Sequence, residues 1–185
     1  MTGFPRRALL TGAAASLALA ACSNGVGSDG AAKLDARADA TMAYLETNYP
    51  GTRDLGDKAV GTLIMPLITE AGFGIGGSYG RGTLRVNDAT VDYYSATQAS
   101  FGLQAGAQQY AHVLYFMTEE ALAEFRASSG LALGADVEYA FNDRAGNLSA
   151  ETTTVLSPVV AVIFGQAGLI AGASVEGTKY TRIIP

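Results

Sequence analysis

Few side chains in this sequence could carry chemistry, and the most distinctive of them is a single thiol. Cys22 is the only cysteine and His112 the only histidine among 185 residues. Metal sites need several ligands close together, and nucleophilic catalysis needs a nucleophile beside a base. A lone histidine in an apolar stretch predicts a packed or surface residue of a strand, and Asp35 and Asp39 predict a solvated helix face. We therefore expect no metal, no cofactor and no catalytic residues, with a Ser- or Asp-dependent hydrolase as the enzymatic alternative.

The segment before Cys22 predicts the fate of its thiol. Arg6 and Arg7 are followed by 14 uncharged residues, 8–21, which end in Leu-Ala-Ala. A charged start, a short apolar run and small residues at its end indicate a signal peptide, and the run is shorter than the ~20 residues of a membrane helix. Leu-Ala-Ala-Cys resembles the bacterial lipobox, where the chain is cut before the cysteine and the thiol is lipidated. The alternative is an ordinary signal peptide, 1–21, with a chance cysteine.

Lipidation of Cys22 would anchor the protein in a membrane. Fatty acyl chains such as palmitate stabilise membrane attachment by ~0.8 kcal/mol for each buried methylene, and one chain alone binds only marginally. Lipoproteins of the lipobox type carry more than one chain. We therefore expect a membrane lipoprotein of the bacterial cell envelope that faces the periplasm. By analogy, Ser23 in place of an aspartate favours the outer membrane, and the arginine pair leaves general and twin-arginine export both open.

Length and composition limit the remaining functions. Residues 22–185 suffice for one domain with a hydrophobic core. The full chain has a formal charge of −5, and loss of Arg6 and Arg7 would make it −7. An acidic chain without basic clusters is a poor binder of nucleic acid and, by charge alone, of anionic bilayers. Residues 22–32, rich in glycine, serine and alanine, predict a flexible tether, and residues 33–185 the folded domain.

The periodicity of the domain predicts an α+β fold. Residues 33–49 place apolar side chains at helical spacing and are followed by Pro50-Gly51. A second helix is expected after Thr118, a good N-cap with two glutamates behind it. Between the helices, alternating apolar residues flank Asn87-Asp88, which predicts a hairpin turn. We further expect strands at 60–65 (stopped by Pro66), 109–117, 137–141, 159–164, 169–175 and 179–184, a short helix near 53–58, a loop at 144–154, a helix end at Gly130 and a turn at Gly177.

Glycine is the compositional outlier, with 23 residues, and it recurs along three expected strands. Alternate residues of a strand share a face, so glycine at every second position leaves that face nearly bare. Glycine in a strand marks a bend or a close backbone approach, and a bare face could also open a groove for an acyl chain. We predict a single domain with a mostly antiparallel, strongly curved, glycine-rich sheet or small barrel, flanked by an N-terminal and a mid-chain helix. The bare positions are 72, 74, 76, 102, 106, 168 and 172.

Two other patterns suggest functions that their context opposes. Residues 72–77 contain the spacing G-x-G-x-x-G, but a dinucleotide site needs a helix directly afterwards, and none is expected. Residues 152–175 carry no charge and include Gly168-x-x-x-Gly172, a spacing seen between membrane helices. A membrane span is therefore an alternative there, although Pro158, Gln166 and the β-branched content favour strands.

Several sequence blocks occur in the same order as in a known domain. They are Ala71–Gly82, Phe101–Gly106, Phe116-Met117-Thr118, Gly168–Gly172 and Glu176–Lys179. Together they resemble the SYLF domain of eukaryotic endocytic adaptors and bacterial exported proteins, with a likeness that runs from about Leu34 to Pro185. The resemblance implies a non-enzymatic lipid-binding module. Eukaryotic members bind phosphoinositides, and some bind actin.

The resemblance also directs attention to cations within or beside these blocks. Phosphate is bound favourably where two or more cationic groups converge. We expect a lipid-anchored protein whose domain binds a phospholipid or phosphoinositide-like headgroup, with no nucleic acid partner and an unknown protein partner. A structural or protein-interaction module of the envelope without a lipid ligand is the alternative, and the cations would then be solvated surface charges. The candidate headgroup cations are Lys58, Arg81, Arg85, Lys179 and Arg182.

Overall fold

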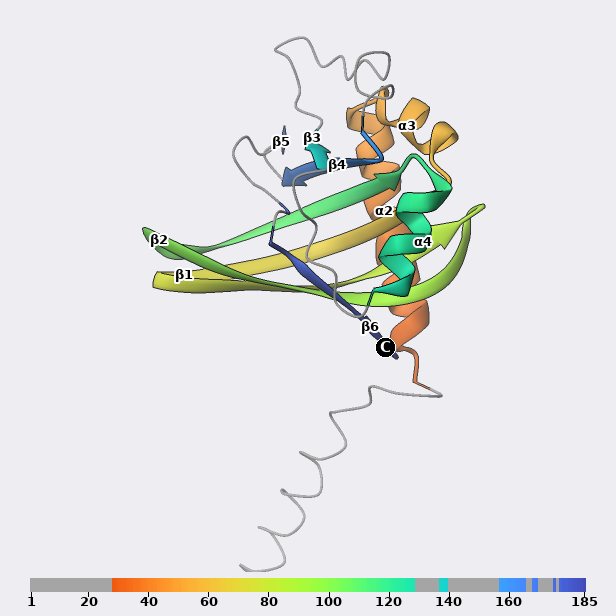
Figure 1. Ribbon diagram of the computed structural model, residues 1–185. Helices are drawn as coiled ribbons and strands as arrows, with labels where there is room; N and C mark the ends of the chain where they lie inside the picture. Colours follow the sequence, from red (N-terminus) through yellow and green to blue (C-terminus); the bar gives the residue numbers. More distant parts are fainter. Residues whose placement is uncertain (1–27, 129–136, 140–156, 166–167, 170–174, 176) are drawn as a thin grey trace, which may run out of the picture.

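A computed structural model describes residues 28–128, 137–139, 157–165, 168–169, 175 and 177–185 (Figure 1). This part of the chain forms a single α+β domain with three helices and a six-stranded, mostly antiparallel sheet, which confirms the predicted class. The elements in chain order are α2 (Gly30–Asn48), α3 (Thr52–Lys58), β1 (Gly61–Val86), β2 (Ala89–Phe116), α4 (Glu119–Ala127), β3 (Val137–Tyr139), β4 (Val159–Gly165), β5 (Gly168–Leu169) and β6 (Lys179–Ile183).

Most predicted elements are present, although β1 and β2 extend well beyond the strands expected at 60–65 and 109–117. The short helix near 53–58 and the strands near 159–164 and 179–184 are confirmed. The signal peptide and Cys22, the loop at 144–154, Gly130 and Gly172 lie outside the described residues.

α2 forms where helical spacing predicted it, with a start three residues earlier. Its buried side chains are Leu34, Ala38 and Leu45, which share one face of the helix. This face packs on the sheet, and the Tyr44 ring stacks on Phe164 with centroids 5.9 Å apart. An apolar stripe, rather than strong end caps, therefore holds the helix in place.

β1 and β2 form one long antiparallel hairpin, paired along both strands. Its turn is Asn87-Asp88, as predicted. Both residues have positive φ, 49° and 63°, the conformation that suits the twist of a two-residue hairpin.

Pro66 does not end the first strand, so that prediction is wrong. β1 continues through it to Val86, and the pairing register shifts between Met65 and Ile68. Proline has no N–H to donate to a neighbouring strand, so it is tolerated where the ladder is interrupted.

The hairpin folds back over itself near its middle, and Figure 1 shows both long strands running to one end of the molecule and returning. A Cβ atom on Gly80 would collide with the backbone of Leu67, and one on Gly82 with the backbone of Ile64. In a straight strand, positions 64 and 82 would lie ~60 Å apart, because each residue advances ~3.3 Å. The strand therefore reverses near Gly74, where its register with β2 shifts.

The glycines of the predicted bare strands pair with one another at this reversal. Gly72 lies opposite Gly106 and Gly74 opposite Gly102. The predicted strongly curved sheet or small barrel is nevertheless wrong, since the described strands neither close on each other nor curl strongly along their length. The strands change direction at one irregular point of the hydrogen-bonded ladder, between Phe73 and Gly74, rather than by bending along their whole length.

β4 is the most thoroughly buried strand and lies between two hydrophobic clusters. Val159, Ala161 and Ile163 belong to the cluster between the two runs of the hairpin, and Val160 and Val162 to the cluster under α2 and α3. A strand covered on both faces has a continuous apolar sequence. This accounts for the part of the uncharged run 152–175 that forms β4. In the described part of the chain, no helix is long and apolar enough to cross a membrane.

α4 and β6 complete the cluster between the two runs of the hairpin. The Thr118 hydroxyl accepts the N–H of Ala121 at 3.2 Å, which confirms the predicted N-cap. Phe125 packs against Tyr94 and Tyr180, with ring centroids 5.0 and 5.6 Å away. Gly177, at φ 74°, turns the chain into β6 as predicted.

Candidate functional site

A small cleft lies where the start of α2 meets the folded hairpin. Its volume is about 160 Å³. Three segments distant in sequence contribute to it: α2 supplies Leu34 and Arg37, the outgoing run of β1 supplies Pro66, Leu67 and Thr69, and the returning run supplies Tyr79, Gly80 and Arg81.

The close approach at Gly80 makes this cleft possible. Stacked strands usually lie ~10 Å apart because side chains separate them. At Gly80 there is no side chain, and an added Cβ would collide with Leu67 and Ile68. Tyr79 and Arg81 flank this glycine and share one face of the strand. The missing side chain at Gly80 lets the backbone of the two runs come close, and Tyr79 and Arg81 then line the cleft together with Leu67.

The charged residues that line the small cleft are both cations, Arg37 and Arg81, and its described lining includes no acidic residue. A larger cleft of about 500 Å³ between α2, α3 and the hairpin turn is mixed in charge. In a chain of net charge −5, the small cleft is therefore a local positive site that suits an anion. The charged residues of the larger cleft are Glu46, Arg53, Asp57, Arg85 and Asp88.

Apolar side chains stand beside the two arginines. Leu67 is 42% exposed and Tyr79 is 54% exposed, among the most exposed large apolar residues of the described chain. Exposed apolar groups next to a charged cleft are typical of a binding surface rather than of a solvated one. The arrangement suits a ligand with an anionic group joined to an apolar part.

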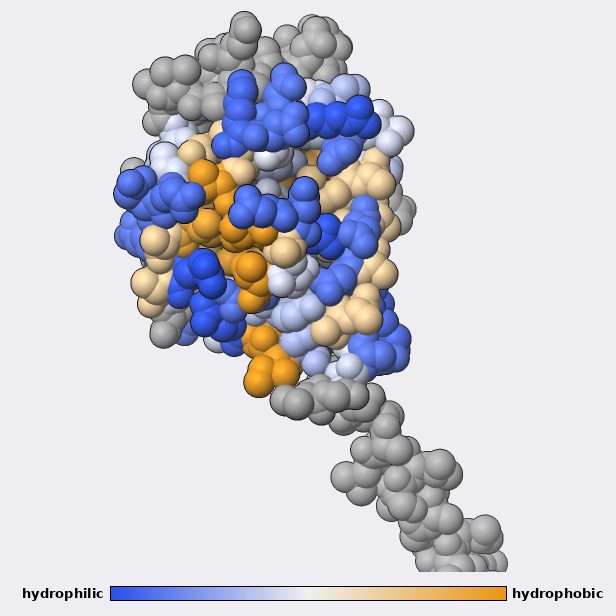
Figure 2. All heavy atoms as spheres, turned by 90° about the vertical axis from the view of Figure 1, so that its right-hand side faces the viewer, coloured by the Kyte–Doolittle hydropathy of each residue, from blue (hydrophilic) through white to orange (hydrophobic). Residues whose placement is uncertain are grey.

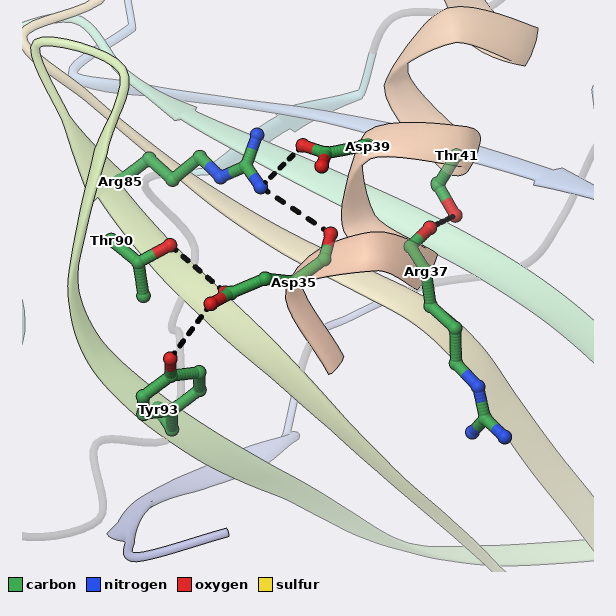
Figure 3. A network of polar contacts seen from close by, with 7 residues as sticks. All are labelled: Asp35, Arg37, Asp39, Thr41, Arg85, Thr90 and Tyr93. Carbon is green, nitrogen blue, oxygen red and sulfur yellow. Dashed lines mark hydrogen bonds and ion pairs between the residues drawn. The ribbon is translucent and has the colours of Figure 1, made fainter. Parts of the chain in front are cut away.

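Arg85, one of the predicted headgroup cations, is fastened to α2 (Figure 3). Its Nη2 lies 2.6 Å from Asp39 Oδ1 and donates to the Asp35 carbonyl oxygen at 3.4 Å. The Asp35 carboxylate accepts hydrogen bonds from Thr90 Oγ1 at 3.0 Å and from the Tyr93 hydroxyl at 2.9 Å. Burial and the bond to Asp35 raise the pKa of Tyr93. Asp39 is exposed, as a solvated face predicts, whereas Asp35 is half-buried and its carboxylate is engaged, and both residues join α2 to the returning hairpin.

Arg182 is engaged in a second ionic cluster. Its Nε lies 3.2 Å from Asp92 Oδ1, and its guanidinium lies 5.9 Å from the centroid of the Tyr94 ring. Asp92 also pairs with Arg126 at 3.3 Å. The hydrogen bond to Tyr94, and then the charge of Asp92, raise the pKa of Arg182. Asp92 thus links β2 to both β6 and α4.

The five predicted cations do not gather around one cleft. Lys58 and Lys179 are exposed, and like Arg182 they line neither of the two clefts. Arg81 lines the small cleft, whereas Arg85 lines the larger one. Their assignment to lipid binding stays a prediction, and the geometry favours Arg81.

Arg37 is the cleft residue that sequence reasoning missed. It is exposed on α2, and Figure 3 shows its side chain pointing away from the Asp35–Arg85 network. Along the chain, nothing indicates that β1 returns to this helix face. The indication in the sequence was the Gly80-Arg81-Gly82 block. Glycines within a strand indicate that another segment comes close to the backbone, but they do not show which segment it is.

The single histidine is a packed core residue of β2, the first of the two expected alternatives. His112 Nε2 lies 2.9 Å from the Tyr180 hydroxyl, and both side chains are buried. Burial lowers the pKa of His112 to about 3, so the ring is neutral near neutral pH. Within the described ranges, no three His, Cys, Asp or Glu residues lie close enough together to hold a metal ion.

Comparison with known proteins identifies the second half of the chain. Residues 97–182 match the Ysc84 family, described as "Las17-binding protein actin regulator". Curated proteins give no match. The matched segment begins within β2, and its first part pairs with β1, so it is built into a fold that extends beyond it. The family is one of non-catalytic binding domains. As the sequence blocks indicated, the chain carries a Ysc84/SYLF family domain over residues 97–182.

Proposed function

We propose that this protein is a lipid-anchored protein of the bacterial cell envelope whose domain binds phospholipid headgroups without catalysing a reaction. The observation that carries the proposal is the small cleft, where Arg37 and Arg81 come together beside the exposed Leu67 and Tyr79. The SYLF family, whose members bind lipid or actin, supports the same function class.

The two arginines would hold a phosphate. Guanidinium groups form charge-assisted, often bidentate, hydrogen bonds with phosphate oxygens. At about 160 Å³ the cleft is smaller than the ~300–1,000 Å³ of sites that enclose whole ligands. It therefore takes a headgroup while the acyl chains stay in the bilayer, and Leu67 and Tyr79 contact the apolar part nearest the phosphate.

Lipidated Cys22 would supply the membrane attachment. Tethering turns headgroup binding into an intramolecular step with a high effective concentration. Low affinity of the cleft for a headgroup is then sufficient to hold the domain on the membrane surface. The protein would face the periplasm, with the outer membrane favoured over the inner one.

A flotation experiment tests the cleft without help from the anchor. The full chain carrying Cys22→Ser is mixed with phosphatidylcholine vesicles that contain or lack phosphatidylglycerol. We expect flotation with the anionic vesicles, and about tenfold weaker binding when Arg37 and Arg81 are both changed to Gln, because a charged hydrogen bond contributes ~1.5–3 kcal/mol.

The matched control is Arg53→Gln with Arg126→Gln. It removes two positive charges outside the small cleft, one from the Arg53–Glu46 pair and one from the Arg126–Asp92 pair, in which Asp92 keeps Arg182 as a second partner. Equal losses in the two double variants would show non-specific attraction and overturn the cleft assignment. Absence of flotation by the Cys22→Ser chain with either vesicle would overturn lipid binding.

A protein-binding module is the second candidate, because the matched family is described by a protein ligand, Las17. In that case, cross-linking in intact cells should capture one envelope protein repeatedly. Capture should be unchanged by Arg37→Gln with Arg81→Gln, since no headgroup would be involved.

A further inference from the structure

We propose that the end of the domain where α2 begins and β6 ends rests on the phospholipid bilayer. This inference rests on the proposed function, because it takes Cys22 to be the anchor. It adds an orientation and a contact surface, called here the terminal end and defined by Ser28, Val91 and Ile184; Pro185, which bonds to Ser28, is buried.

The two ends of the described domain are fastened to each other. Ser28 Oγ donates to the carbonyl oxygen of Pro185 at 3.1 Å, and the N–H of Gly30 donates to Ser28 Oγ at 3.2 Å. A Cβ on Gly30 would lie 2.7 Å from the carbonyl carbon of Pro185, closer than real contacts allow. The point where a tether would leave the domain is therefore fixed on the surface formed by the last residues of the chain.

The length of the tether limits which surface can meet the membrane. Cys22 is six positions before Ser28, and a fully extended chain covers at most ~21 Å over that distance. α2, with 19 residues, is ~28 Å long. The far end of α2, at Thr47, thus lies farther from the exit point than the tether reaches. The terminal end is the surface held nearest the lipid.

The terminal end has the composition of a membrane contact. Ile184 is 69% exposed, more than any other large apolar residue in the described chain, and Val91 is 40% exposed. Figure 2 shows an apolar spot at the lower end of the described domain. Transfer of an exposed isoleucine side chain out of water into the bilayer is favourable.

Two acidic groups near this end, Asp29 and Asp92, are paired with cations, whereas the Asp35 carboxylate accepts hydrogen bonds from Thr90 and Tyr93. Asp29 pairs with Lys33 at 2.7 Å, and Asp92 pairs with Arg182 and Arg126 at 3.2 and 3.3 Å. The ion pairs reduce the repulsion that unpaired carboxylates would feel near an anionic bilayer.

The small cleft lies close to this end. Leu34 and Arg37 are four and seven residues from Gly30, which corresponds to ~6–10 Å along the axis of α2. A domain seated on its terminal end would hold the cleft at headgroup level. Anchor, apolar contact and cationic cleft would then act on the same bilayer surface.

Fluorescence quenching in proteoliposomes tests the orientation with the lipidated full chain. A fluorophore is attached to a single new thiol, either Ile184→Cys at the terminal end or Thr47→Cys at the exposed far end of α2. Vesicles of phosphatidylcholine and phosphatidylglycerol carry a quencher on their headgroups. We expect quenching to be several-fold stronger at position 184 than at position 47. Equal quenching, or stronger quenching at position 47, would overturn the orientation.

Labelling of the unsubstituted chain with the same fluorophore distinguishes an error in the orientation from an error in the proposed anchoring. A lipidated Cys22 has no free thiol, so the unsubstituted chain should take up no fluorophore. Labelling at Cys22 would show that the anchor is missing and would overturn the orientation together with the anchoring. An error in the assignment of the small cleft to headgroup binding would be detected by the flotation experiment, where the Arg37→Gln, Arg81→Gln chain would float as well as the chain that keeps both arginines.

Discussion

Gly82 lies against the backbone of Ile64, although both belong to the same strand and are eighteen residues apart. This contact exists because the long hairpin reverses near Gly74 and lays its returning run over its outgoing run. The same crossing brings Arg81 to the start of α2. The architecture and the candidate site therefore depend on one close approach of backbone to backbone.

The first prediction concerns Gly82→Ala. The new Cβ would collide with the Ile64 carbonyl and the Met65 sulfur, and such overpacking destabilises a core by ~1–3 kcal/mol or more. We expect a lower urea midpoint by far-ultraviolet circular dichroism. The control is Gly56→Ala within α3, where the nearest atom, on Tyr115, is 3.9 Å away and alanine favours the helix. Equal stability of the two variants would contradict the crossing.

The second prediction concerns pH. Burial lowers the pKa of His112 from 6.5 to about 3 in the folded state. Below pH 6.5 the unfolded chain therefore binds a proton that the folded chain does not, and the free energy of unfolding falls by ~1.4 kcal/mol per pH unit until about pH 3. Above pH 6.5 this contribution is fully present.

The substitution His112→Gln isolates this effect. Glutamine stays neutral and offers an amide to the Tyr180 hydroxyl, so it removes the titration while keeping a polar partner. We expect a shallower fall in the urea midpoint between pH 6.5 and 4 than in the unsubstituted chain. Parallel pH profiles would mean that His112 is not buried as described.

The third prediction concerns Asp35→Ala. The change leaves the hydroxyls of Thr90 and Tyr93 without their shared acceptor, which costs ~1–3 kcal/mol when the groups stay away from water. We expect a lower thermal midpoint. The control is Thr47→Ala at an exposed position of the same helix, which should change the free energy of unfolding by no more than ~0.5 kcal/mol. Equal effects would show that the network does not hold α2.

The fourth prediction concerns salt. If Arg37 and Arg81 hold a phosphate, binding of the Cys22→Ser chain to vesicles with phosphatidylglycerol should weaken as ionic strength rises, because salt screens charge attraction. Replacement of both arginines by glutamine should flatten this dependence. A slope that the double substitution leaves unchanged would place the electrostatic contact elsewhere.

Much of the local structure could be predicted because it depends on short-range patterns. Apolar spacing indicated α2, Thr118 indicated the start of α4, and Asn87-Asp88 indicated the turn. Strand ends were less predictable. Pro66 normally stops a strand, but an irregularity in the ladder allows β1 to continue through it.

Propensity, caps and turn chemistry act over a few neighbouring residues, so the helices, the hairpin turn and the family resemblance could be read from the amino-acid order. Which charged groups meet depends instead on the folded arrangement of distant segments. Arg85 joins Asp39, Arg182 joins Asp92, and Arg37 shares a cleft with Arg81. These partners are far apart in the chain, and their meeting follows from the reversal of β1, which no short-range pattern specifies.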